Sequence, residues 1–231
     1  MGAAVHQAGI EWQRRLLAWL GKLDGNHSLA AASELSIVAG TISSEDGHIR
    51  VPVEDVLRAG GTALVDELSF TITSDGGNEA GPVSQSFGAH FCEVEIDEEI
   101  GRATVTRWVA VMDCGRVLNP KLARNQVMGG VLFGLGMALL EKVPYDPETA
   151  RLIGEYYLPT HPDVPDFDIA FVDTPDYGLG AIGVRGIGEI GTCGVPAAIA
   201  NAIFHATGKR LRDLPITLEQ LMTPFDAGAP S

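Results

Sequence analysis

Apolar and polar residues alternate most clearly between Phe87 and Asp97. Every second residue from Cys92 to Ile96 is apolar, and the residues between them are acidic. This period of two predicts a half-buried strand. A tight turn at Glu98–Gly101 follows, and Ala103–Met112 returns as a second strand. The two stretches therefore predict an antiparallel hairpin.

Three longer stretches carry apolar residues at helical spacing: residues 3–23, 120–142 and 195–207. Asn119 is a suitable N-cap, Pro120 fits the first helical position, and Gly208 fits the C-terminal cap. The middle helix contains four glycines, each of which costs roughly 1 kcal/mol relative to alanine. Such a number predicts close backbone packing. They are Gly129, Gly130, Gly134 and Gly136.

Shorter elements complete the predicted fold. Short helices are expected at Val53–Ala59, ended by Gly60-Gly61, and at Leu218–Met222, and Ser74–Ser86 is a predicted loop. The expected short strands are Leu35–Val38, His48–Val51, Leu68–Thr73, Leu152–Leu158 and Phe167–Asp173, and Leu211–Thr217 is expected to be extended.

The predicted fold class is α+β, with helices 120–142 and 195–207 packed on a mixed, largely antiparallel sheet. We expect a single domain over residues 1–231, with residues 223–231 as a loose tail.

Composition narrows the function classes. The net charge is −14 and there is no run of Lys or Arg, which argues against nucleic-acid binding. No apolar run approaches the ~18 residues of a membrane helix. The three cysteines are far apart, so no iron–sulfur cluster or cysteine-rich zinc site is expected within this chain. The expected compartment is the cytoplasm, with the periplasm left open if a partner directs export.

The segment from Gly178 to Gly194 is the strongest candidate for chemistry. It is rich in glycine, otherwise mostly apolar, and contains a lone Arg185 and a lone Glu189. Glycines let a backbone approach a bulky ligand closely. A carboxylate in such surroundings is expected to be desolvated, which raises its pKa and makes it a better base. A flexible surface loop is the alternative.

Other interpretations of this segment are weaker. The spacing of Gly183, Gly186 and Gly188 has the wrong order for a dinucleotide fingerprint. Cys193 could serve as a nucleophile, but a small apolar filler is favoured because the nearest histidine in sequence, His205, lies about three helical turns further on. No metal site formed by protein ligands is expected.

Three blocks of sequence, taken together and in order, resemble the molybdenum hydroxylase family of xanthine dehydrogenase and aldehyde oxidase. The similarity covers residues 84–222 best and identifies them as the C-terminal half of a molybdenum-cofactor-binding domain. The blocks are Phe87–Asp97 with Val111–Pro120, then Gln126–Glu141, then Arg185–Glu189 with Ala197–Ile203 and Ala206–Thr217.

The resemblance implies roles for particular residues. Gly188-Glu189 matches the Gly-Glu pair that faces molybdenum, so Glu189 is the expected base in hydroxylation of an aldehyde or N-heterocycle with oxygen from water. Gln126 matches a glutamine near the pterin and is assigned to cofactor binding, and Arg185 is a candidate for lining the site. Further cofactor-binding candidates are Gly188, Ile190, Gly191, Thr192 and Cys193.

The resemblance also implies the cofactor and the partners. The pterin, not the protein, would hold molybdenum. Glu189-Ile190-Gly191 departs from the Gly-Glu-Pro of many relatives and, with Asp213–Thr217, looks most like bacterial three-subunit aldehyde oxidoreductases. This implies the cytosine dinucleotide form, with [2Fe-2S] and FAD on partner chains only. The expected partners are the N-terminal half of the large subunit, iron–sulfur and flavin subunits and a small-molecule substrate, without nucleic acid or membrane.

The chain is several times shorter than the family's large subunit. It is therefore expected to be inactive without the rest of the enzyme. The alternative hypothesis is a non-catalytic assembly or structural fragment.

Overall fold

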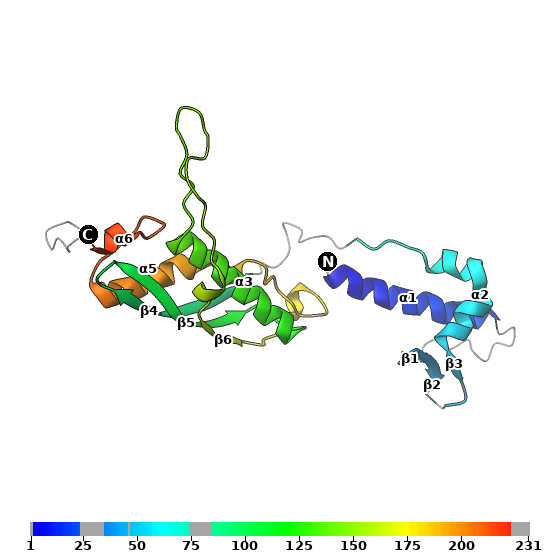
Figure 1. Ribbon diagram of the computed structural model, residues 1–231. Helices are drawn as coiled ribbons and strands as arrows, with labels where there is room; N and C mark the ends of the chain where they lie inside the picture. The colour runs from blue at the N-terminus through cyan, green and yellow to red at the C-terminus, as the bar shows by residue number, and fades with distance from the viewer. Residues whose placement is uncertain (1, 24–34, 46, 74–84, 223–231) are drawn as a thin grey trace. The chain divides into compact units, whose positions relative to one another are not determined.

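The computed structural model describes residues 2–23, 35–45, 47–73 and 85–222 (Figure 1). The chain forms two compact units, Met1–Gly81 and Pro82–Ser231. The boundary falls within the predicted loop 74–86, most of which lies outside the described residues, as does the predicted tail 223–231. The best-matching core, 84–222, falls within the second unit. The expectation of a single domain over 1–231 stays a prediction.

The first unit combines two helices with a small antiparallel sheet. Helix α1 (Gly2–Leu23) confirms the predicted N-terminal helix. The sheet has the order β1-β2-β3 and consists of β1 (Leu35–Val38), β2 (Thr41–Ser44) and β3 (Arg50–Pro52). The helices and the sheet share a buried cluster of Leu16, Leu20, Ile42, Val56 and Leu64.

Helix α2 (Val53–Leu68) is longer than predicted. The glycine pair was expected to end the helix, but Gly61 adopts a positive φ of 53° and the chain kinks there and continues as helix. The predicted strand Leu68–Thr73 is wrong. Leu68 ends the helix, and residues 69–73 pair with no strand in the described part of the chain. The weak alternation at 68–73 had no partner strand to stabilise it.

The second unit is built on a mixed sheet. Strands β4 (Phe87–Asp97) and β5 (Arg102–Asp113) form the predicted antiparallel hairpin, and β6 (Asp166–Phe171) pairs with β5 in parallel. The register shifts after Glu93. The side chains at every second position of β4 from His90 to Ile96 are partly buried, as the alternation predicted.

Two long helices supply the other half of this core. They are α3 (Pro120–Leu139) and α5 (Val195–Thr207). The Asn119 side chain caps α3 by accepting a hydrogen bond from the Leu122 N–H at 3.1 Å. Gly208 ends α5 with a φ of 73°. The fully buried side chains between helices and sheet are Trp108, Ala110, Met112, Val127, Val131, Ala138, Val195, Ile199 and Ile203.

Short elements connect these layers. They are α4 (Ile190–Cys193), α6 (Leu218–Met222) and two 3₁₀ turns, η2 (His161–Asp163) and η3 (Tyr177–Leu179). Helix α4 was not predicted, because the glycines around it favoured a loop.

The predicted strand Leu152–Leu158 is wrong. These residues belong to a long loop between α3 and β6, and this loop extends away from α3 and α5 (Figure 1). Only Leu152 forms a bridge, with Tyr145, and a strand needs a longer ladder to be stable.

Residues 211–217 form no regular element, although the Ile216 N–H donates to the Ala138 carbonyl at 2.7 Å. No helix within the described ranges is both long and apolar enough to cross a membrane.

Candidate functional site

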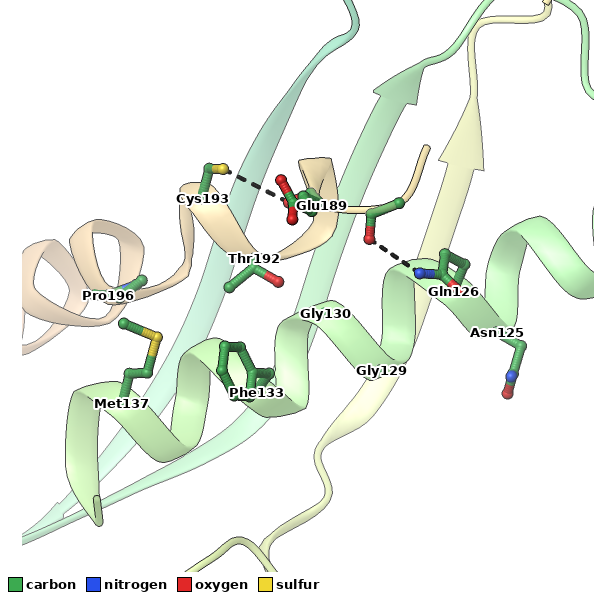
Figure 2. Close-up of a pocket in the computed structure, with 11 residues that line it drawn as sticks. Asn125, Gln126, Gly129, Gly130, Phe133, Met137, Glu189, Thr192, Cys193 and Pro196 are labelled. Atoms are coloured by element: carbon green, nitrogen blue, oxygen red, sulfur yellow. Dashed lines mark hydrogen bonds between the residues drawn. The ribbon is translucent and has the colours of Figure 1, made fainter. Parts of the chain in front are cut away.

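A pocket of about 670 Å³ lies between α3 and the segment that leads through α4 into α5 (Figure 2). The two walls come from residues about sixty positions apart in sequence. The lining residues are Asn125, Gln126, Gly129, Gly130, Phe133, Met137, Gly188, Glu189, Thr192, Cys193 and Pro196. The structure therefore brings Gln126 and Glu189, the two residues to which the resemblance assigned roles, to the same pocket.

Glycine allows the two walls to approach so closely. A Cβ on Gly130 would lie 2.9 Å from the Gly191 carbonyl carbon, and a Cβ on Gly191 would lie 2.9 Å from the Val127 carbonyl oxygen. A Cβ on Gly134 would lie 2.5 Å from the Val195 Cβ. These contacts are below van der Waals separation, so no larger residue fits without a shift of the backbone. The predicted close packing is confirmed for Gly130, Gly134 and Gly136 and is wrong for Gly129, where a Cβ would meet no atom within 4 Å.

Gln126 connects the two walls directly. Its Nε2 donates a hydrogen bond to the Gly188 carbonyl at 2.9 Å, and Figure 2 shows this bond beside Glu189. The residue before Glu189 is thus tied to α3 by a side chain. Gln126 is exposed, as is Glu189.

The exposure of Glu189 corrects one expectation. The apolar residues of its segment were expected to desolvate the carboxylate. Instead they face the protein interior: Ile187 and Ile190 pack against the hydrophobic core. The described residues leave the Glu189 side chain open to solvent at the pocket.

The remaining cofactor-binding candidates divide into two groups. Thr192 and Cys193 line the pocket, and Cys193 is exposed, with its thiol 3.6 Å from the Glu189 carbonyl oxygen. Ile190 and Gly191 do not line it, because Ile190 packs on the core and Gly191 is buried against α3. Exposure makes an apolar filler role for Cys193 incorrect.

Arg185 does not line the pocket and serves another contact. Its guanidinium pairs with Asp113 at the end of β5 and with Asp176 at 3.1 Å, and its side chain is only 12% exposed. The backbone adds two bonds, from the Arg185 N–H to the Cys114 carbonyl at 2.7 Å and from the Arg116 N–H to the Gly183 carbonyl at 2.8 Å. Arg185 therefore anchors the glycine-rich segment to the sheet.

His90, which the sequence did not single out as a site residue, contacts Ile190, the residue after Glu189. His90 lies on β4, accepts a hydrogen bond from the Trp108 indole at 3.2 Å through Nδ1, and places Nε2 3.3 Å from the Ile190 carbonyl oxygen. Burial lowers the pKa of His90 below its ordinary value, and the hydrogen bond to Ile190 opposes that effect.

The other two cysteines differ from Cys193. Burial raises the pKa of the Cys92 thiol to about 11. Burial, followed by the negative charge of Asp113, raises the pKa of Cys114. Both thiols are therefore poor nucleophiles at neutral pH.

Sequence reasoning missed most of the α3 wall and, on α5, Pro196. The residues concerned are Asn125, Gly129, Gly130, Phe133, Met137 and Pro196. The glycines inside the predicted helix were the one available signal, because they indicated a close neighbour without identifying it.

Residues 1–165 match the model of the molybdopterin cofactor-binding domain family. The chain belongs to this family. The resemblance found in the sequence is thereby confirmed at the level of the family. The matched range of this molybdopterin-binding chain includes Gln126 and ends before Glu189.

Two curated proteins are similar in sequence to part of this chain. The chain is 42% identical over 141 residues to the aldehyde oxidoreductase molybdenum-binding subunit PaoC of Escherichia coli K12, covering 59% of this chain and 19% of PaoC. It is 37% identical over 144 residues to the nicotine 6-hydroxylase large subunit of Paenarthrobacter nicotinovorans, covering 59% of this chain and 17% of that subunit.

A solved structure supports the fold over a longer range. Quinoline 2-oxidoreductase from Pseudomonas putida 86 superposes with a TM-score of 0.68 and 26% identity, over 91% of this chain and 27% of that chain. The mixed α+β fold class is therefore confirmed. The molybdopterin-binding chain spans about a fifth of the length of the curated relatives it matches.

Proposed function

We propose that this chain supplies one wall of the active site of a molybdenum hydroxylase that oxidises aldehydes, or N-heterocycles, with water as the oxygen source. The observation that carries the proposal is the shared pocket of Gln126 and Glu189, in a chain 42% identical over 141 residues to an aldehyde oxidoreductase molybdenum-binding subunit. We expect the assembly in the cytoplasm, or in the periplasm if a partner carries an export signal.

The pocket has room for a large cofactor. A Cβ at Gly129 or Gly188 would meet no atom within 4 Å, so both walls present bare backbone to open space. Its volume of about 670 Å³ lies within the range of ligand sites, ~300–1,000 Å³. These features support a molybdenum–pterin cofactor, and we assign its cytosine dinucleotide form from the sequence resemblance. When bound, this cofactor would supply the two-electron redox chemistry.

Five of the lining residues then have roles. Gln126 uses one N–H of its amide on Gly188, so its carbonyl oxygen and its second N–H remain for the cofactor. Gly188, Thr192 and Cys193 present backbone or small side chains to the cofactor. Glu189 takes the proton from the water-derived oxygen nucleophile as that oxygen attacks the substrate carbon, which is general-base catalysis.

Partner chains complete the site. The exposed Glu189 needs a second wall that excludes water before it can work as a buried base, and we assign this wall to the remaining part of the large subunit. Iron–sulfur and flavin subunits would carry electrons away. Alone, the chain is expected to be inactive.

Glu189→Gln tests the proposal in the enzyme isolated with its partner chains. Turnover should fall by at least ~100-fold, a typical contribution of a general base, while the molybdenum content stays unchanged. The matched control is Glu98→Gln, an exposed carboxylate in the turn between β4 and β5, which should leave both unchanged. Near-normal turnover in Glu189→Gln would refute the role of Glu189.

The open Glu189 side chain also favours a second candidate function, a non-catalytic assembly domain. The two candidates differ in metal content. Elemental mass spectrometry on the native complex should find molybdenum near one atom per chain for the enzyme. Absence of molybdenum would favour the assembly domain.

A further inference from the structure

The carbonyl that follows Glu189 is held by a histidine from a distant strand. His90 on β4 places Nε2 3.3 Å from the Ile190 oxygen, one hundred residues away in sequence. The histidine ring also fits closely against the start of α5. A Cβ on Gly194 would lie 2.5 Å from the His90 Cδ2, so only glycine allows this approach.

Trp108 determines which nitrogen of His90 carries the proton. The indole N–H can only donate, and it lies 3.2 Å from His90 Nδ1. Nδ1 must therefore be unprotonated, and in the neutral ring the proton resides on Nε2. That proton points to the Ile190 carbonyl, which can only accept. Trp108, His90 and Ile190 thus form a chain of hydrogen bonds with one consistent direction.

We propose that His90, oriented by Trp108, is a positioning residue that fixes the backbone of Glu189 through the Ile190 carbonyl. This inference rests on the proposed function, because it assigns His90 a role in the chemistry of Glu189. The Thr192 N–H donates to the Glu189 carbonyl at 3.0 Å, so the turn held by His90 contains Glu189 itself. Loss of the His90 bond would release this turn from the sheet.

The positioning role requires the hydrogen bond from His90 to the Ile190 carbonyl, and not merely a ring that fills the space. Three substitutions separate these requirements. His90→Gln keeps an N–H donor near the position of Nε2, His90→Asn keeps an amide near Nδ1 but no donor near Nε2, and His90→Phe keeps the ring without either bond. A packing role predicts that Phe is tolerated best. A positioning role predicts that Gln is.

Two measurements on the full chain, without cofactor, test the geometry. Nitrogen NMR of the His90 ring should show the proton on Nε2. Hydrogen exchange at the Thr192 amide should be as slow in His90→Gln as in the unmodified chain, and at least ~10-fold faster in His90→Phe and His90→Asn. A proton on Nδ1, or unchanged Thr192 exchange in His90→Phe, would overturn the proposal.

Kinetics of the molybdenum-loaded complex test the consequence. Because a small misplacement of a catalytic group can cost up to ~100-fold, His90→Phe should lower kcat by ~10- to 100-fold with KM nearly unchanged, and His90→Gln should restore most of it. Equal kcat in all variants would overturn the positioning role. A complex without molybdenum or activity would refute the proposed function instead, and the NMR and exchange results would then stand by themselves.

Discussion

Adjacent glycines of α3 provide a controlled test of how the pocket is built. Gly129 and Gly130 occupy the same helix, but their surroundings differ. A Cβ on Gly129 meets nothing within 4 Å, whereas a Cβ on Gly130 would lie 2.9 Å and 3.0 Å from the Gly191 carbonyl carbon and Cα. We therefore expect Gly129→Ala to stabilise the second unit and Gly130→Ala to be the less stable of the two variants.

The magnitude follows from two terms. Replacing glycine by alanine inside a helix adds about 1 kcal/mol to the free energy of unfolding, and this term is common to both variants. Carbon atoms pack at about 3.5–4.0 Å, so the new methyl at position 130 must push the α4 backbone away by ~0.5–1 Å. Overpacking of this kind costs about 1–3 kcal/mol. The helix term cancels in the difference, so Gly130→Ala should be less stable than Gly129→Ala by about 1–3 kcal/mol.

Urea unfolding of the full chain measures this difference. Because the chain has two compact units, the probe must report on the second one. The indole N–H signal of Trp108, which lies in the core beside α3, meets this requirement. Similar m-values in both variants would show that the midpoints report stability alone.

The same pair tests the pocket. The methyl of Gly129→Ala would project into the space assigned to the cofactor, so this stabilised variant should carry less molybdenum in the assembled enzyme. If Gly130→Ala were as stable as Gly129→Ala, the close approach of α3 and α4 would be refuted. A full molybdenum content in Gly129→Ala would show that the cofactor does not bind against this helix.

Two further predictions concern thiols and the Arg185 anchor. Iodoacetamide at pH 8 should alkylate the exposed Cys193 first. Cys92, whose pKa is raised to about 11, should react roughly 100-fold more slowly at this pH than a thiol of ordinary pKa 9.0. The alkylation rate of Cys92 should rise roughly 100-fold between pH 8 and pH 10, because its thiolate fraction still increases below the pKa. Peptide mass spectrometry measures both rates, and equal labelling at pH 8 would contradict the burial of Cys92. Arg185→Gln should lower Tm by several degrees because it leaves the buried Asp113 without its counter-charge, and Asp176→Asn should cost less because Asp176 is 32% exposed. Equal losses in thermal unfolding would refute this ranking.

Local patterns predicted much of the second unit. The alternation of Phe87–Asp97 and the Asn119 cap define β4 and the start of α3, because each depends on neighbouring residues alone. The pocket depends on contacts between distant segments, which such patterns do not encode. Gly130 and Gly191 each signalled a close neighbour, but nothing in the sequence paired them. Likewise, Arg185 was placed near the site although its partners, Asp113 and Asp176, hold it elsewhere.

Glu189 is fixed by its two neighbours and not by its own side chain. The Gly188 carbonyl accepts from Gln126 on α3, and the Ile190 carbonyl accepts from His90 on β4. The backbone of Glu189 is therefore held from the helix and from the sheet, while its carboxylate extends into open space. Catalytic groups need such fixed geometry before their chemistry can be efficient, and a group held at its backbone can receive cofactor and substrate without rearrangement. Under the proposed function, this chain would therefore supply the orientation of Glu189, and the remaining part of the large subunit would exclude water from the pocket.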